Sequence, residues 1–344
     1  MSDRNPFHQL FLARMRDFYR QPEVIFWVFG FPILLAVGLG IAFREKAPDE
    51  IAVGIVRGAG DEQTLAAFDA KDGFKVKLID AADSENELRL GKVAIVVVPS
   101  AEPTLQFDPT RPESVLARAR VDAALQRAAG RVDPLSLRED LVTKPGARYI
   151  DFLIPGLLGM NIMSGGLWGI GFVIVEMRSR KLLKRLIATP MKKSHFMAAA
   201  IAARMVLVIG EVTLLLFFGW LVFDLVIQGS WAFVMALAFL GAFTFAGIGL
   251  LVASRARKIE TVSGLMNLVM MPMFVTSGVF FSSERFPDVV QPLIQALPLT
   301  ALNDALRAVI LEGADVTSQL PRIAIIGAWG LVTFVLALRF FRWN

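Results

Sequence analysis

Long apolar runs separated by short charged segments dominate the pattern along this chain of 344 residues. An α-helix needs about 20 apolar residues to cross a bilayer. The runs approach or exceed that length, so the pattern predicts membrane-spanning helices rather than strands. The predicted spans are Val24–Phe43 (within residues 23–43), Tyr149–Val175, Met197–Phe223, Trp231–Ser254, Thr261–Phe281 and Ile323–Leu338. The last has only 16 residues, and we expect the arginines at its two ends to reach outward.

Charged residues concentrate between the first two spans. Residues 44–148 hold 34 of the 67 charged side chains, in under a third of the length. Alternating apolar and polar positions there predict short strands, and helical periodicity predicts short helices between them. We therefore expect a small α/β domain inserted at residues 44–148 into an α-helical polytopic membrane protein. The predicted strands are Ile51–Arg57, Phe74–Ile79, Val93–Val98 and Thr104–Phe107, and the predicted helices are Glu62–Asp69, Glu85–Leu90 and Pro112–Arg131.

Two further segments are amphipathic but too short to span. Residues 6–20, within an N-terminal segment of residues 1–22, place aromatic and aliphatic side chains on one helical face, which predicts either a helix lying in the membrane interface or a short cytoplasmic helix packed on protein. Arg14 lies on that apolar face and is expected to snorkel. Residues 282–320 predict short helices, Phe286–Leu297 and Leu302–Leu311, broken by prolines. We expect them to be re-entrant, covered by protein.

The second predicted span runs directly into a basic segment. No charge occurs from Phe152 to Val175, whereas seven Lys and Arg side chains occupy the 16 positions 178–193. Such clusters stay on the cytoplasmic side of a membrane. Counting lysines and arginines in the other loops then places both termini in the cytoplasm and residues 44–148 outside. The basic segment, residues 176–194, is thus an internal surface that a partner can bind.

Composition excludes several functions. With no cysteine and only two histidines, thiolate metal sites are absent from the sequence, and we expect no metal site. The net charge of +5 lies at helix ends, without a basic stripe that would predict nucleic-acid binding. No P-loop and no common hydrolase motif occurs, so we expect the chain to be no enzyme. Gly58 and Gly60 resemble part of a dinucleotide fingerprint, but Gln63 replaces its third glycine, which favours a simple turn.

Several residues within the spans are candidates for translocation or gating. Glu211 lies inside the third span, where an ionisable group is a functional hypothesis by default. Arg204 lies seven positions earlier on the same helical face, so a structural ion pair is the alternative. Gly165 and Gly169 form a G-x-x-x-G spacing, which favours close helix packing. Met270 belongs to a methionine-rich stretch that either lines an adaptable path or fills the core.

Several motifs follow one another along nearly the whole chain. They are the N-terminal amphipathic helix, Leu88–Pro99, Glu176 with Leu183-Lys-Arg-Leu186-Ile-Ala-Thr189-Pro190, Pro272–Phe281 with Ser277-Gly278, and Pro287, Pro298-Leu-Thr300 and Leu306-Arg307. In this order they resemble the permease subunit of the ABC-2 family of ATP-binding-cassette exporters, in the branch with a large external domain. Many relatives carry Gly-Thr and an acidic residue ahead of the Leu-x-x-Thr-Pro motif. Here Lys181, Leu182 and Lys184 occupy those places, so charge complementarity to a partner differs.

The resemblance implies a transport subunit in a bacterial plasma (inner) membrane. Its partners would be two copies of an ATP-binding subunit, which hold ATP and Mg, and a second permease copy in a homodimer or heterodimer; no cofactor is implied in this chain. Ser277 and Gly278 become gating candidates. The basic segment becomes a coupling helix that contacts the ATPase through Glu176, Leu183, Lys184, Arg185, Leu186, Thr189 and Pro190.

Two other classes stay open from the residues alone. A carrier driven by an ion gradient predicts carboxylates within the membrane, of which Glu211 is the one candidate. A membrane-anchored external binding module would use the spans only as an anchor. Drugs, lipids, peptides and glycans all remain possible substrates of an exporter.

Overall fold

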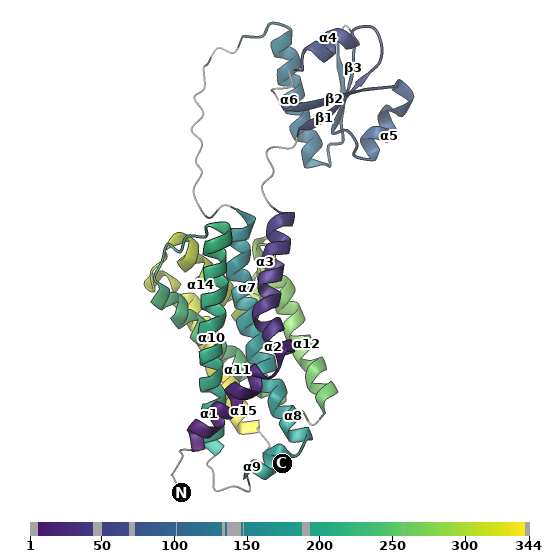
Figure 1. The fold of residues 1–344 in the computed structure, drawn as a ribbon. Helices are drawn as coiled ribbons and strands as arrows, with labels where there is room; N and C mark the ends of the chain where they lie inside the picture. Colours follow the sequence, from purple (N-terminus) through teal and green to yellow (C-terminus); the bar gives the residue numbers. More distant parts are fainter. Residues whose placement is uncertain are drawn as a thin grey trace. The chain divides into compact units, whose positions relative to one another are not determined.

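The computed structural model describes residues 6–43, 50–68, 73–100, 102–132, 135, 146, 148–187, 193–256 and 258–340. The chain divides into two compact units. Unit 1 comprises residues 1–44 and 143–344, and unit 2 comprises residues 45–142. Figure 1 shows unit 1 as a bundle of long helices and unit 2 as a small sheet flanked by helices.

Unit 1 contains, among its described residues, six helices long and apolar enough to cross a membrane, which confirms the predicted number. Each span follows an apolar run, and several are built from more than one helical element. The elements are α1 (Pro6–Tyr19); α2 (Pro22–Ile25), η1 (Phe26–Gly30) and α3 (Phe31–Ala42) in span one; α7 (Tyr149–Gly166), η4 (Leu167–Phe172) and α8 (Val173–Ser179) in span two; α9 (Leu182–Ile187); α10 (Lys193–Phe223) in span three; α11 (Trp231–Ala253) as span four; α12 (Ile259–Thr276) as span five; η5 (Ser283–Arg285), α13 (Gln291–Gln295) and α14 (Pro298–Glu312); and η6 (Thr317–Gln319) with α15 (Leu320–Phe340) in span six.

Three predicted boundaries were wrong. Span five ends at Thr276 rather than Phe281, because Gly278 has a φ of 69°, a left-handed conformation that terminates helices. Span six covers Thr317–Phe340 and has 24 residues instead of 16, since a proline is tolerated in the first turn of its helix α15. The helix predicted over Phe286–Leu297 forms only at Gln291–Gln295, where Pro292 occupies the first turn.

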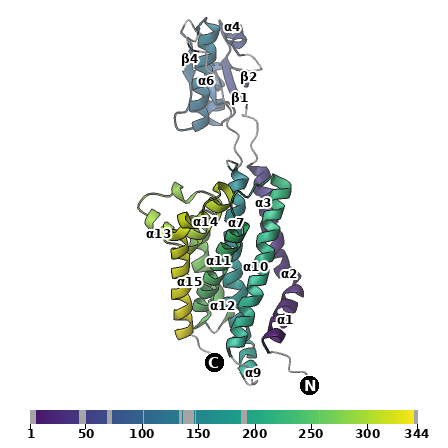
Figure 2. The same ribbon diagram turned by 90° about the vertical axis from the view of Figure 1, so that its left-hand side faces the viewer.

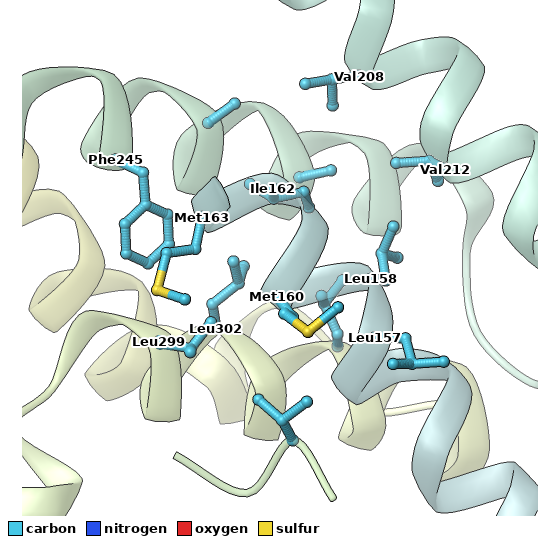
Figure 3. Packing of buried hydrophobic residues seen from close by; sticks show 14 of the residues in the cluster. Leu157, Leu158, Met160, Ile162, Met163, Val208, Val212, Phe245, Leu299 and Leu302 are labelled. Atoms are coloured by element: carbon cyan, nitrogen blue, oxygen red, sulfur yellow. The ribbon is translucent and has the colours of Figure 1, made fainter. Parts of the chain in front are cut away.

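Spans two and four form the centre of the bundle. In each of these two spans, 67% of an apolar stretch of 18 residues is buried, compared with 17–33% of the corresponding stretch in the other four spans. Figure 3 shows α7 side chains such as Met163 packing toward Phe245 of α11 and Leu299 and Leu302 of α14. Glycines bring the two central spans together: a Cβ on Gly171 would lie 2.5 Å from the carbonyl oxygen of Gly249. Small residues at such contacts permit close helix approach.

Unit 2 is built on a four-stranded sheet with the order β2-β1-β3-β4. Its strands are β1 (Ile51–Val56), β2 (Phe74–Ile79), β3 (Ile95–Val98) and β4 (Thr104–Gln106). β1 pairs in parallel with β2 and β3, and β4 pairs antiparallel with β3. The helices between them are α4 (Asp61–Ala66), η3 (Ala81–Asp83) and α5 (Ser84–Arg89), and α6 (Pro112–Ala128) follows β4.

Alternation along the strands gives unit 2 two apolar faces. Val53 and Ile55 of β1 pack in one cluster with Val121 of α6, whereas Val56 packs in a second cluster against Leu88 of α5. This is the pattern expected for a sheet covered by helices on both sides. The turn before α4 contains Gly60 with a φ of 98°, so this glycine-containing loop serves as a tight turn into a helix of six residues.

Candidate functional site

The basic segment, as far as the structure describes it, is a helical hairpin at the end of span two. α8 and α9 are joined at Lys181, which has a φ of 61° and reverses the chain direction. Thr189 and Pro190 lie outside the described residues. Lys184 and Leu186 lie on α9, but their side chains are outside the described part. The exposed positions of this hairpin include Lys181, Leu182 and Arg185, while the predicted contact residue Glu176 is half-buried.

Leu183 faces inward. It is 2% exposed and packs with Ile170 and Ile174 of span two and with Leu250 of α11. The prediction that Leu183 contacts a partner needs correction, because a side chain buried within its own chain cannot bind another protein directly. Leu183 therefore packs α9 against the bundle.

Two arginines fix the geometry of the hairpin further. Arg178 donates from Nη1 to the carbonyl oxygens of Ala253, at 2.9 Å, and Ala256, at 2.6 Å. These carbonyls lie at and just past the C-terminus of α11, where a cation is favoured by the unpaired acceptors and the helix dipole. Arg180 pairs with Glu176 at 2.8 Å. The basic segment is thus attached to both central spans, and the side chains of Lys181 and Arg185 are exposed.

Glu211 forms the ion pair with Arg204 that their spacing predicts. Arg204 Nη2 donates to Glu211 Oε2 at 3.0 Å, and Nη1 donates to Oε1 of the same carboxylate. The two side chains are only 4% and 0% exposed. Arg204 also donates to the carbonyl oxygen of Ile162 at 3.4 Å. The charge on Glu211 is therefore balanced within its own helix, next to span two.

The two predicted glycines have different surroundings. A Cβ on Gly165 would overlap the guanidinium of Arg204, whereas a Cβ on Gly169 would meet nothing within 4 Å. Gly165 thus makes room for the buried ion pair rather than for a neighbouring backbone. The carbonyl oxygen of Gly169 accepts a hydrogen bond from Arg14 Nη2 at 3.0 Å. Arg14 therefore turns toward the protein, and its predicted snorkelling was wrong.

Met270 lies in the C-terminal half of span five, and the Ser277-Gly278 turn follows that span. Met270 Sδ accepts a hydrogen bond from Ser164 at 3.9 Å. Asn303 of α14 donates to the carbonyl oxygen of Ser277 at 2.8 Å. Arg307 donates to the carbonyl oxygen of Gly278.

Arg307 also reaches the start of span two. Its Nε donates to the carbonyl oxygen of Phe152 at 3.2 Å, and its guanidinium lies 3.6 Å from the centre of the Phe152 ring. The turn after span five is therefore held to α14 and, through Arg307, to α7. Sequence reasoning missed Asn303 as a binding partner of this turn; the available signal was a polar amide on an otherwise apolar helix face.

The predicted residues fall into two groups that the fold keeps apart. Figure 2 shows α9 and α14 at opposite ends of unit 1, with Glu211 on the helix α10 that runs between these ends. Within the described ranges no three His, Asp or Glu side chains are placed to hold a metal ion. The described site residues thus form a partly exposed hairpin at one end of unit 1 and a hydrogen-bonded turn, Ser277-Gly278, at the other.

The fold and these contacts define a multi-pass membrane protein of the helical-bundle class, with a buried core around spans two and four. Residues 22–339 match the family described as ABC-2 family transporter protein, and the chain belongs to that family.

Three of the relatives are named as permeases. The putative transport permease YvfS of Bacillus subtilis is 25% identical over 145 residues, which are 40% of this chain and 56% of the relative. The inner membrane transport permease YhhJ of Escherichia coli is 26% identical over 174 residues, 50% of this chain and 46% of the relative. The linearmycin resistance permease protein LnrN of Bacillus subtilis is 27% identical over 184 residues, which are 51% of this chain and 45% of the relative. The chain spans about half the length of these relatives.

Proposed function

We propose that this chain is the permease subunit of an ABC-2 exporter that moves a substrate outward across a bacterial inner membrane. Membership of the family over residues 22–339 is the observation that carries the proposal. The permease names of the relatives support it. ATP and Mg would be bound by a separate ATP-binding subunit, two copies of which would serve two permease copies.

The hairpin α8–α9 is the proposed contact with the ATPase. Arg185 and Leu182 are exposed on α9. Because Leu183 and Arg178 attach the hairpin to the central spans, a force applied to α9 is passed to spans two and four. Rigid, packed elements of this kind are what transmit a conformational change between distant sites.

The proposed topology places both termini and the hairpin in the cytoplasm and unit 2 outside. In unit 1, Figure 1 shows α1 and α9 at the same end of the bundle, and α14 lies at the other end. The excess of lysine and arginine near α1 and α9 supports a cytoplasmic location for that end. The segments α13 and α14 are then re-entrant on the outer side, where the clamped Ser277-Gly278 turn is part of an outer gate.

The ion-gradient carrier is less well supported by the geometry. A proton- or sodium-coupling carboxylate must exchange its ion during transport. Glu211 instead binds Arg204 through both carboxylate oxygens and is fully buried. This pairing favours a structural or gating role over ion coupling.

Reconstitution with and without the ATPase tests the proposal. We expect vesicles holding both proteins to transport substrate only with hydrolysable ATP. Arg185→Glu, a charge reversal on the exposed α9 surface, should weaken ATPase binding, whereas Lys75→Glu on the exposed edge of unit 2 should not. Transport that continues without any ATPase would refute the proposal.

The absence of native cysteines allows an independent check of topology. Single cysteines at Lys92 and Arg185 should react with a membrane-impermeant maleimide from opposite sides of the membrane. Labelling of both from the same side would refute the proposed orientation.

A further inference from the structure

The first two spans each contain one π-helical turn, η1 at Phe26–Gly30 and η4 at Leu167–Phe172. Such turns are rare, interrupt the regular α-helical hydrogen bonds and occur often at functional sites. Each turn here contains a main-chain carbonyl that accepts a hydrogen bond from a side chain of a different element. The two turns are therefore two of the places where a side chain joins neighbouring elements of unit 1 through a main-chain carbonyl.

The cause of the first turn can be read from the sequence. In a regular helix the N–H of residue 32 would donate to the carbonyl of Val28, but residue 32 is proline and has no N–H. The main-chain hydrogen bonds therefore change from the α-helical to the π-helical pattern, in which the N–H of Phe31 donates to the carbonyl of Phe26, five residues earlier. Asn161 of span two fills the vacant acceptor: its Nδ2 donates to the carbonyl of Val28 at 2.8 Å. Asn161 itself is only 8% exposed.

The second turn is bound by the N-terminal helix. Arg14 of α1 donates from Nη2 to the carbonyl oxygen of Gly169 at 3.0 Å. The Arg14 side chain is 25% exposed, and its Nη1 lies 3.9 Å from Oδ2 of Asp17 on the same helix. Burial lowers the pKa of Arg14, and the nearby carboxylates of Asp17 and Glu176 oppose that change. A charged donor on a carbonyl in such surroundings makes one of the stronger hydrogen bonds in proteins.

These two bonds form a continuous connection. It runs from α1 through Arg14 to span two, and from span two through Asn161 to span one. Glu176, which contributes to the charge around Arg14, lies on α8, within the hairpin that we assign to the ATPase contact. A displacement of the hairpin therefore acts on span two at η4, next to the point where α1 is attached.

We propose that Arg14 and Asn161 are positioning residues which make α1 and spans one and two move as one body when the α8–α9 hairpin is displaced. This inference rests on the proposed function for its driving force. Without Arg14 the hairpin would still bind its partner, but its displacement would not be passed to α1 at the π-helical turn η4. Without Asn161 the motion would reach span two and not span one.

The test uses the full permease with its ATPase in lipid nanodiscs and vesicles. Arg14→Gln keeps a neutral donor of shorter reach, Arg14→Lys keeps the charge, and Arg16→Gln on the exposed side of the same helix is the matched control. We expect Arg14→Gln to lower transport per ATP hydrolysed by about threefold to thirtyfold, the range typical for residues that couple two sites. Arg14→Lys should recover part of the loss, and Arg16→Gln should behave as the unsubstituted protein.

A distance measurement separates positioning from general damage. Spin labels at Gln9→Cys on α1 and Ser179→Cys at the end of α8 would be alone in a chain without cysteine. We expect one narrow distance distribution that keeps its width when ATP is added, and a broad one in Arg14→Gln. A narrow distribution in Arg14→Gln, with undiminished transport per ATP, would overturn the inference.

Pro32→Ala gives a second, independent test at the first turn. It restores an N–H at residue 32, so the carbonyl of Val28 regains a donor within its own helix. Asn161→Leu should then reduce transport per ATP strongly in the native background and only slightly in Pro32→Ala. Equal losses in both backgrounds would contradict the role of Asn161. If the unsubstituted complex shows no ATP-dependent transport, the proposed function fails, whereas the spin-label distances still decide whether Arg14 joins α1 to span two.

Discussion

Removing one member of the Arg204–Glu211 pair should destabilise unit 1 far more than removing both. The two side chains are 4% and 0% exposed and share two hydrogen bonds, so a lone carboxylate at this place would be left without water or a counter-ion. Breaking a buried pair from one side costs about 3–5 kcal/mol, whereas replacing both members by apolar side chains of similar volume is often neutral or stabilising. We therefore expect Arg204→Met to lose about 3–5 kcal/mol and Arg204→Met/Glu211→Leu to regain most of it.

Denaturant unfolding of the purified chain in mixed micelles measures these differences. Gly165→Ala provides a third perturbation, because its Cβ would overlap the Arg204 guanidinium without changing either charge. It should be destabilising in the native background and much less so in the double variant, where methionine can move aside. A double variant as unstable as Arg204→Met would refute the reasoning, since it would mean that mutual neutralisation is not what the pair provides.

The same double variant decides what Glu211 does. If it is stable and transports normally with the ATPase, the pair is structural and the gating prediction for Glu211 is wrong. If it is stable but transports poorly, the carboxylate takes part in the motion. Stability and transport must therefore be measured on the same preparation.

Three further outcomes are expected from other contacts. Gly159→Ala should destabilise unit 1 by about 1–3 kcal/mol, an overpacking cost, because its Cβ would overlap Asn303 Oδ1, while Gly169→Ala, with open space at its Cβ, should be nearly neutral in the same melting assay. Arg178→Met should cost about 1.5–3 kcal/mol, since it removes charged donors from two carbonyls; a melting temperature unchanged from that of the native chain would contradict this. Hydrogen bonds from Lys77 and Lys92 lower the pKa of Glu87, so the stability it gives to unit 2 is present above the pKa of the unfolded carboxyl and is lost as the pH falls through the lower folded value. Glu87→Gln should make hydrogen exchange in β2 and α5, corrected for intrinsic rates, less dependent on pH below about 4.

The sequence predicted those features that repeat along the chain. The length of the apolar runs predicted all six spans, and the spacing of Arg204 and Glu211 predicted their ion pair. Boundaries were less accurate where a single backbone conformation decides them, as at Gly278. Periodicity reports the average environment of many residues, so it cannot locate one left-handed residue.

Several polar contacts between elements of unit 1 were harder to predict because they join a side chain to a main-chain carbonyl. Arg14, Asn161 and Arg307 each bind such a carbonyl in another element. Any residue supplies a carbonyl, so the acceptor leaves no trace in the sequence. The donors did leave one, since a polar side chain within or beside an apolar run needs a partner. Leu183 shows the opposite case: its motif suggested an exposed contact, but only the structure shows that it is buried.

β2 and β4 are the edge strands of the sheet in unit 2, and features of both disfavour the addition of a further strand. On one side β2 carries the exposed Lys75 and Lys77, whose charges would repel an incoming strand of the same sequence. On the other side β4 has only three residues, too few to act as a template. Natural proteins use such features to prevent edge-to-edge aggregation. In a crowded membrane, unit 2 of one copy can therefore lie close to unit 2 of another copy without their strands pairing into one sheet.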